Sequence, residues 1–442
     1  MYVNKLLFSI MLCCIASVAA ATPTIQHWQS ATGARVLFVE DHDIPMLDVA
    51  VSFASGSAFD KSGKPGVAKL THELLDLGAG DLNEDQISTG MADLGAQLSG
   101  SFDQDRASVS LRTLSTERDS ALSIMARVLQ YPVFSESILM REKTRLIAGL
   151  KEAETKPELI ADKAFNKAVF GSHPYASSLS GEISSLETIT AQDLKDFYQL
   201  HYQRAVVAIM GDVTRVQAEA IAVQLTRYLP AYTEQSSLPA VVMQIQSSEQ
   251  RIFHPATQSH ILTGTPGMSR KDPDYFPLYV GNYILGGGGF VSRLMNEVRE
   301  KRGLAYSVYS YFMPLKQTGA FQIGLQTKKE QANEALALVE KTLADFVAKG
   351  PTEKELIAAK QNIIGGFPLR IDSNKKILDY LSIIGFYELP LTYLDDFADN
   401  IAHVTTTQIH SAFSRHIHPG AMATVIVGAP EPISGPVGAQ NQ

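Results

Sequence analysis

The chain has 442 residues, of which 45% are hydrophobic and 19% are charged, and its formal net charge at pH 7 is −8. This composition excludes a disordered protein, and the length predicts two or three domains. The acidic balance, with no block of basic residues, argues against nucleic acid as a partner.

The first 21 residues have the three parts of a secretory signal. Lys5 precedes an uncharged run over residues 6–20, which ends in small residues suited to signal peptidase. The run is shorter than the roughly 20 residues that a membrane span needs. Both cysteines, Cys13 and Cys14, lie within it, so the exported chain is expected to have no disulfide and no thiol chemistry. We therefore expect a protein of the bacterial periplasm, with no membrane attachment after signal removal.

The rest of the chain contains one long internal repeat. Gly95 and Ser99 correspond to Gly303 and Ser307 at a displacement of 208 residues. Each copy continues with an alternating strand that ends in Leu-x-Thr and then with two amphipathic helical stretches. A repeat of this length is a duplicated domain and not a solenoid. The pattern predicts an α+β fold of two homologous domains, each an antiparallel-rich sheet with helices packed on one face.

The duplication sets the expected domain boundaries. A segment rich in Pro, Ser and Thr separates the copies, and the end of the chain has the composition of a disordered tail. The expected divisions are a signal peptide at 1–21, an N-terminal domain at 22–232, a linker at 233–245, a C-terminal domain at 246–430 and a disordered tail at 431–442.

The stretch KLTHELLDL, residues 69–77, carries adjacent His and Glu on a predicted helix. In the arrangement His-Glu-x-x-His, two His one turn apart hold zinc and the Glu activates water. Here Asp76 stands where the second His would be. One hypothesis is therefore a self-sufficient metallopeptidase that uses His72, Glu73 and Asp76, although the sequence identifies no third ligand.

Three segments carry a resemblance to a known family. They are GVAKLTHELL (66–75), HPYA (173–176) and LGGGGFVSRLMNEVREKRGLAYSVYS (285–310). They resemble the insulinase and pitrilysin family of zinc peptidases, in its shorter two-domain bacterial form, and the likeness covers nearly the whole exported chain. It implies that the two domains form half of a clamshell chamber, which a second chain completes.

The resemblance also implies that the zinc site has been lost. The family's first zinc His falls on Lys69, its catalytic Glu on His72 and its second His on Glu73. Its third ligand, a Glu on a later helix, falls on Gly149. Without these groups the chain alone is expected to bind no zinc and to have no peptidase activity.

In its second domain the family places an Arg and a Tyr seven residues apart, across the chamber from the zinc, where they hold the substrate backbone. Arg299 and Tyr306 have that spacing. A guanidinium and a phenol both suit an oxygen that gains negative charge. The resemblance implies a non-catalytic subunit that binds peptide substrates, with a homologous partner supplying His-x-x-Glu-His and its zinc in a heterodimer.

Other interpretations come from different classes of function. One is a scaffold or peptide-binding protein that has lost catalysis. The core subunits of the respiratory cytochrome bc1 complex resemble a protein of this kind. The glycine run at 286–289 lacks the Gly-Lys-Ser/Thr of a phosphate site. The resemblance implies that it is a tight loop entering the helix with Arg293, and a flexible loop that contacts substrate is the alternative. The segment HIH, residues 416–418, is expected to be a surface strand with His416 and His418 on one face; a metal site there is the less favoured alternative.

Overall fold

The computed structural model describes residues 23–234, 237–243 and 245–429. The predicted signal peptide at 1–21 and the predicted tail at 431–442 lie outside these described residues. Within the described ranges, no helix is both long enough and apolar enough to cross a membrane.

The N-terminal half is built on a six-stranded sheet with the strand order β1-β2-β8-β3-β7-β6. Neighbouring strands are antiparallel except β2 and β8, which are parallel. The strands are β1 (Gln26–Gln29), β2 (Arg35–Glu40), β3 (Met46–Phe53), β6 (Gln97–Phe102), β7 (Ala107–Leu114) and β8 (Val206–Gly211). A separate two-stranded ribbon joins β4 (Gly78–Ala79) and β5 (Leu82–Asn83).

The C-terminal half repeats this sheet without its first strand. Its order is β11-β12-β10-β13-β9, and the parallel pair is now β13 with β9. The strands are β9 (Ser248–Phe253), β10 (Gln258–Pro266), β11 (Ser307–Phe312), β12 (Ala320–Lys328) and β13 (Ala423–Ala429). The matching topologies confirm the predicted α+β fold of two homologous domains, and β1 has no counterpart in the second.

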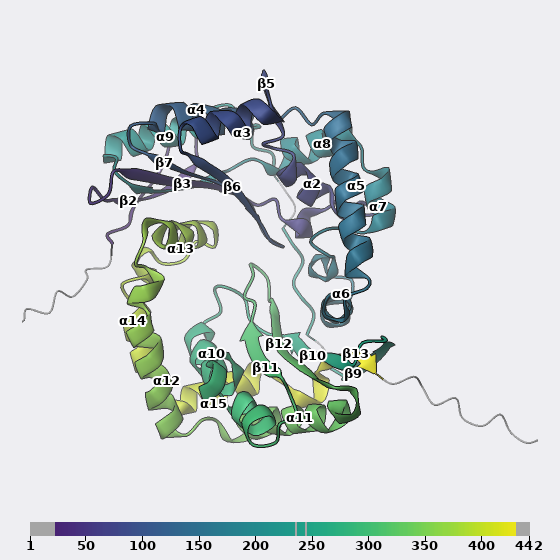
Figure 1. The fold of residues 1–442 in the computed structure, drawn as a ribbon. Helices are drawn as coiled ribbons and strands as arrows, with labels where there is room; N and C mark the ends of the chain where they lie inside the picture. Colours follow the sequence, from purple (N-terminus) through teal and green to yellow (C-terminus); the bar gives the residue numbers. More distant parts are fainter. Residues whose placement is uncertain (1–22, 235–236, 244, 430–442) are drawn as a thin grey trace, which may run out of the picture.

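Helices of each half pack on the outer face of their own sheet. In Figure 1, α4 and α9 lie above the N-terminal sheet, and α11 and α15 lie below the C-terminal sheet. The helices of the N-terminal half are α2 (Val67–Glu73), α3 (Glu84–Asp93), α4 (Arg118–Gln130), α5 (Glu136–Ala153), α6 (Pro157–Phe170), α7 (Ile183–Thr188), α8 (Ala191–His201) and α9 (Arg215–Thr226). Those of the C-terminal half are α10 (Tyr275–Asn282), α11 (Ala332–Lys349), α12 (Glu353–Gly366), α13 (Asn374–Phe386), α14 (Phe397–His403) and α15 (Thr406–His416).

Two helices are exchanged between the halves. Helix α6 follows α5 in the N-terminal half but packs on β10 and β13 of the C-terminal sheet. Its counterpart α13 follows α12 and packs on β8, β3 and β2 of the N-terminal sheet, below which it lies in Figure 1. Each sheet is therefore covered on its second face by a helix from the other half.

Strand β2 shows how one strand serves two cores. Val36 and Phe38 belong to the core of the N-terminal half, whereas Leu37 and Val39 belong to the core that contains Leu381 of α13. Successive side chains of a strand point to opposite faces, so a strand covered on both sides needs an unbroken apolar run. The run Val36–Val39 meets that need.

A glycine lies at the contact point of each exchanged helix. A Cβ on Gly385 of α13 would lie 2.6 Å from Leu37 Cδ1 and 2.6 Å from Val206 Cγ1. A Cβ on Gly264 of β10 would lie 2.6 Å from Cζ of Phe165 on α6. Neither contact leaves room for a side chain, so the close approach of helix to sheet depends on glycine.

A buried carboxylate joins the two halves. Asp105, in the turn between β6 and β7, is fully buried. It accepts hydrogen bonds from the Tyr175 hydroxyl (2.5 Å) and from the Tyr387 hydroxyl (3.0 Å). It also accepts one from the backbone N–H of Lys316 (2.7 Å). Tyr175 belongs to the N-terminal half, and Tyr387 and Lys316 belong to the C-terminal half, so this cluster fixes one half against the other.

The predicted linker passes beside this cluster. The Leu238 carbonyl oxygen accepts a hydrogen bond from Gln317 Nε2 (3.2 Å), and the Pro239 carbonyl oxygen lies 3.0 Å from His173 Nε2. His173 and Tyr175 come from the HPYA segment, so that motif has a structural role at the junction of the halves.

We expect Gly385→Ala to destabilise the protein although alanine favours helix. The added methyl group overpacks the contact with Leu37 and Val206, which should lower the free energy of unfolding by about 1–3 kcal/mol. The matched control is Gly365→Ala in α12, where a Cβ meets nothing within 4 Å and helix propensity should add up to about 1 kcal/mol. Urea unfolding followed by circular dichroism measures both. Equal stabilisation by the two substitutions would contradict the close helix approach.

Candidate functional site

Helix α2 carries the three positions on which the family's two zinc-binding His residues and its catalytic Glu fall. Lys69 and Glu73 lie one turn apart and form a salt bridge of 3.0 Å. Glu73 also accepts a hydrogen bond from Arg145 of α5, at 3.1 Å. The carboxylate of Glu73 is therefore held between two cations, one from its own helix and one from α5.

The ion pairs continue along α5. Arg145 Nε lies 2.6 Å from Glu142, and Arg141 bridges Glu142 and Glu84 of α3, each at 2.8 Å. Burial opposes ionisation of Glu142, but the hydrogen bonds from Arg145 and Arg141 outweigh it and lower its pKa. The arginines of these pairs are more than half exposed to solvent, which limits each pair to about 1 kcal/mol, so the series serves mainly to align α2, α3 and α5. This network was not predicted from the sequence, although the spacing of Arg141, Glu142 and Arg145 could have indicated it.

Gly149 lies on α5 one turn beyond Arg145. It is exposed, and a Cβ built on it would meet nothing within 4 Å. The side chain that reaches from α5 to α2 is therefore that of Arg145. The structure brings Lys69 and Glu73 together with α5, and a cation occupies the approach to Glu73.

His72 is buried against strand β6. Its ring stacks on Phe102 with centroids 5.8 Å apart, and Nδ1 has no hydrogen-bond partner among the described residues. Burial, assisted by the charge of Lys69, lowers the pKa of His72 to about 4. A Cβ on Gly100 of β6 would lie 2.6 Å from His72 Nε2. His72 is thus a neutral ring packed against the sheet edge.

The hypothesis of a self-sufficient site on His72, Glu73 and Asp76 has no matching geometry. Helix α2 ends at Glu73, so Asp76 does not follow His72 on the next helical turn. In the part of the chain that the structure describes, the group of His, Asp and Glu residues close enough to share a metal lies elsewhere, at Asp272, Asp274 and His416.

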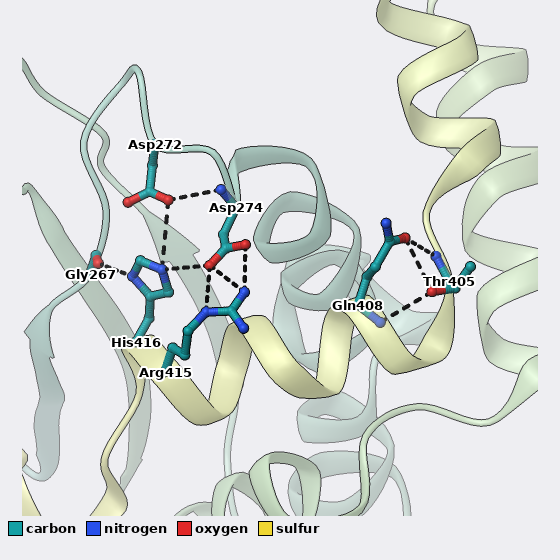
Figure 2. A network of polar contacts seen from close by, with 7 residues as sticks. All are labelled: Gly267, Asp272, Asp274, Thr405, Gln408, Arg415 and His416. Atoms are coloured by element: carbon teal, nitrogen blue, oxygen red, sulfur yellow. Dashed lines mark hydrogen bonds and ion pairs between the residues drawn. The ribbon is translucent and has the colours of Figure 1, made fainter.

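That second cluster is an ion-pair network, shown in Figure 2. His416 lies 3.1 Å from Asp274 and 3.6 Å from Asp272. Arg415 donates to both oxygens of Asp274 at 2.7 Å, so a guanidinium already holds the carboxylate that a cation would need. The other ring nitrogen of His416 lies 3.0 Å from the Gly267 carbonyl oxygen.

The expected strand at 416–418 was wrong. His416 is the last residue of α15, and Ile417 follows as its C-cap. Thr405 and Gln408 form a capping box at the start of this helix, also drawn in Figure 2, and the helix runs on to His416. The capping box fixes a helix of three turns, which the three residues HIH taken alone did not indicate.

Arg299 lies in a π-helical turn, Met295–Glu300, that follows the glycine run. Its guanidinium carbon lies 5.1 Å from the centre of the Phe290 ring, a cation–π distance. Its nearest carboxylate, that of Glu300, is 3.9 Å away, and the side chain is 38% exposed. One N–H of its guanidinium donates to Met295 Sδ at 3.9 Å, and most of the remaining donors are free for a ligand.

Tyr306 directly precedes β11. Its backbone N–H donates to the Gln326 carbonyl oxygen at 2.9 Å, which fixes its position at the start of the strand. The residue is 52% exposed. Within the described residues its hydroxyl has no hydrogen-bond partner, so the phenol is free to donate.

Two exposed apolar residues, of which Phe290 contacts Arg299, were not identified as functional candidates. Phe290 and Val291, at the end of the glycine run, are 67% and 75% exposed. Exposed neighbours of this size are typical of contact surfaces. They end a short 3₁₀ turn, Gly289–Val291, which follows a π-helical turn, Tyr283–Gly287. The expected tight loop at the glycine run was therefore wrong, because most of the run lies in these helical turns.

One open sheet edge lies next to Lys69, His72 and Glu73, and another lies next to Tyr306. Strand β6 is the last strand of the N-terminal sheet, and β11 is the last strand of the C-terminal sheet. A pocket of about 310 Å³ lies beside β6 and is lined by Lys69, His72, Glu73 and Phe102 among others. Edge strands offer unpaired N–H and C=O groups to an extended peptide.

Comparison with known proteins gives consistent matches along the chain. Residues 35–182 match the family model described as Insulinase (Peptidase family M16), and residues 188–363 match the model described as Peptidase M16 inactive domain. A crystal structure of a peptidase M16 inactive domain from Pseudomonas fluorescens is 38% identical, with a TM-score of 0.88, over 92% of this chain and 98% of that chain.

Two other proteins share this likeness at lower identity. The Helicobacter pylori protein called non-peptidase homolog YmxG is 27% identical over 96% of this chain and 98% of its own length. The periplasmic protease PqqL from Escherichia coli has the same fold at 15% identity, with a TM-score of 0.77, over 93% of this chain and 46% of that one.

The burial of His72 predicts a specific loss of stability in acid. A folded-state pKa of about 4, against about 6.5 for an exposed His, means that folding favours the neutral ring. The stabilisation is complete above pH 6.5 and is lost as the pH falls towards 4, by on the order of 3 kcal/mol. In His72→Leu this loss should be absent. Urea unfolding at pH 7.0, 5.5 and 4.5 measures the difference, and parallel pH curves for the two proteins would contradict it.

Proposed function

The chain belongs to peptidase family M16 as an inactive member, and we propose that it is the non-catalytic, substrate-binding subunit of a periplasmic heterodimeric zinc peptidase. The proposed partner is a homologous chain that carries His-x-x-Glu-His and holds the zinc. Peptides are the proposed substrates, and Arg299 and Tyr306 are the residues that this chain supplies.

One contrast carries the proposal. The positions matched to the zinc ligands hold an ion-pair network through Glu73 and a packed neutral His72, so they have another structural use. Arg299 is half-buried and Tyr306 is exposed, and both have their donors largely free. A chain that only served as a scaffold would have no need of two free donors at this spacing.

Arg299 and Tyr306 would act on the substrate carbonyl. The partner's zinc would supply an activated water. The guanidinium and the phenol donate hydrogen bonds to the carbonyl oxygen, and these bonds strengthen as that oxygen becomes negative. The cation–π contact with Phe290 limits the motion of Arg299, which lowers the entropy lost when it binds the oxygen.

The sheet edges support an extended peptide as the substrate. A peptide that adds to β6 or β11 gains backbone hydrogen bonds without regard to its sequence. A folded protein has no free strand to offer, so unfolded or short peptides are the proposed class. Phe290 and Val291 supply apolar contacts beside Arg299.

The relative lengths of similar proteins support a two-chain assembly. The periplasmic E. coli protease is about twice as long as this chain, because the match covers 93% of one and 46% of the other. A chain with half of such a fold needs a second half to close a chamber. Native mass and zinc content of the protein taken from its own periplasm test this directly. We expect about twice the chain mass, an unlike partner and one zinc; a zinc-free monomer would contradict it.

A second candidate is a peptide-binding or scaffold protein with no catalytic partner. The observation that favours it is the match, over 98% of its length, to the Helicobacter pylori protein called a non-peptidase homolog. The two candidates differ in one outcome, which is whether Arg299 and Tyr306 change the rate of peptide cleavage.

Arg299→Ala or Tyr306→Phe should lower kcat/KM of the assembled complex by about 10- to 1000-fold, the range for loss of an oxyanion donor. The matched control is Arg302→Ala, three residues from Arg299 and similarly exposed but already paired with Glu297 at 2.9 Å. It should leave kcat/KM within about twofold of wild type. Cleavage of a fluorogenic peptide measures all three. Unchanged kinetics in both test variants would remove the catalytic role and leave the scaffold alternative.

A further inference from the structure

The two halves differ at one sheet edge. Strands β2 and β9 are counterparts, since each pairs in parallel with the strand that ends its half of the fold, β8 and β13 respectively. On its other side β2 is covered by β1, which runs antiparallel to it. In the described residues nothing pairs with the corresponding side of β9. The N-terminal half therefore shows what covers this edge, namely an antiparallel strand.

A groove of about 830 Å³ runs beside the open edge. The side chains of Gln250 and Ile252, which alternate with Arg251 along β9, line it. The rest of its apolar lining comes from α5, α6 and α7: Leu150, Ala153, Leu159, Ile160, Ala164 and Ile183. A strand added to β9 would place every second side chain in this groove.

The charged residues of the groove come from different elements. Lys163 and Lys167 belong to the wall formed by α6, whereas Glu154 is the C-cap of α5, and Glu182 and Glu187 are the N-cap and a residue of α7. In the described chain neither lysine has a carboxylate partner, and Lys167 donates to the Gly171 carbonyl oxygen at 3.1 Å. The α6 wall therefore offers unpaired positive charge to an occupant.

We infer that the β9 edge and this groove form a second peptide-binding site, separate from Arg299 and Tyr306. Its occupant is an extended peptide that adds antiparallel to β9, with alternate apolar side chains in the groove and an acidic residue against α6. The unpaired backbone groups of β9 supply the affinity, and the apolar lining and the two lysines supply the selectivity. The inference rests on the proposed function only in taking peptides as ligands.

The probe is a fluorescein-labelled, acetylated peptide of the sequence Glu-Thr-Val-Thr-Val-Thr-Lys amide. We expect saturable binding to the purified protein by fluorescence anisotropy. A control peptide with N-methyl groups on alternate residues, which cannot donate to β9, should bind at least tenfold more weakly. Equal binding of the two peptides, or no saturable binding, would overturn the inference.

Two substitutions on β9 test whether the probe binds on the groove side of the sheet or on its other face. Ile252→Lys should raise the Kd of the probe at least tenfold, whereas Arg251→Ala, whose side chain points away from the groove, should leave it within twofold. Because Ile252→Lys could also disturb the sheet, the exposed pair Lys163→Glu and Lys167→Glu provides a second test. This double substitution should raise the Kd of the probe about fivefold, and replacing the probe's Glu by Lys should restore binding.

Two further measurements distinguish the β9 groove from the first site and from capture of the chain's own end. Arg299→Ala should leave the Kd of the probe unchanged, so that failure of the peptidase proposal and failure of this site can be told apart. Loss of probe binding in Arg299→Ala would place the probe at the first site and overturn the inference. Binding that appears only after removal of residues 430–442 would show that the chain's own end is the occupant, and would overturn it as well.

Discussion

The arrangement of the two halves depends on one buried carboxylate. Burial raises the pKa of Asp105, yet its two oxygens accept three hydrogen bonds that come from both halves. Each buried donor that lost this acceptor would cost about 1–3 kcal/mol. Removing the carboxylate would therefore release Tyr175 and Tyr387 together, and with them the junction at which the linker also lies. The relative position of the two sheets follows from this cluster as much as from their cores.

The exchanged helices make the same junction rigid over a larger area. Because α6 and α13 each fill the second face of the opposite sheet, rotation of one half against the other would separate both helices from their cores. In the proposed assembly of two chains, this chain should therefore move as one body. Opening would then take place between subunits, and the positions of Arg299 and Tyr306 relative to α2 would stay fixed.

The features that depend on local pattern could be predicted from the sequence. The duplication, the fold class and the family belong to this group. Strand alternation, helix spacing and the segment 285–310 are patterns of residues that lie close together in the sequence. The helix exchange could not be predicted, because the apolar faces of α6 and α13 look the same whichever sheet they cover. The contact of Glu73 with Arg145 could not be predicted either, since the two residues lie 72 positions apart, whereas its pairing with Lys69 joins neighbours on one helical turn. His416 was misplaced because a three-residue pattern was interpreted without the capping box that begins its helix.

The helix exchange also has a consequence for the origin of the chain. A single copy of the repeat would keep its equivalent of α6 or α13 with no sheet of its own to cover, and would leave one sheet face open to water. Two such copies could each cover the open sheet face of the other by exchanging that helix. Such an exchange is a low-cost route to a symmetric dimer. The present chain has the geometry of a domain-swapped dimer whose two protomers were joined by gene fusion. Once fused, the copies were free to diverge, and β1 and Arg299 are differences that an identical pair could not have held.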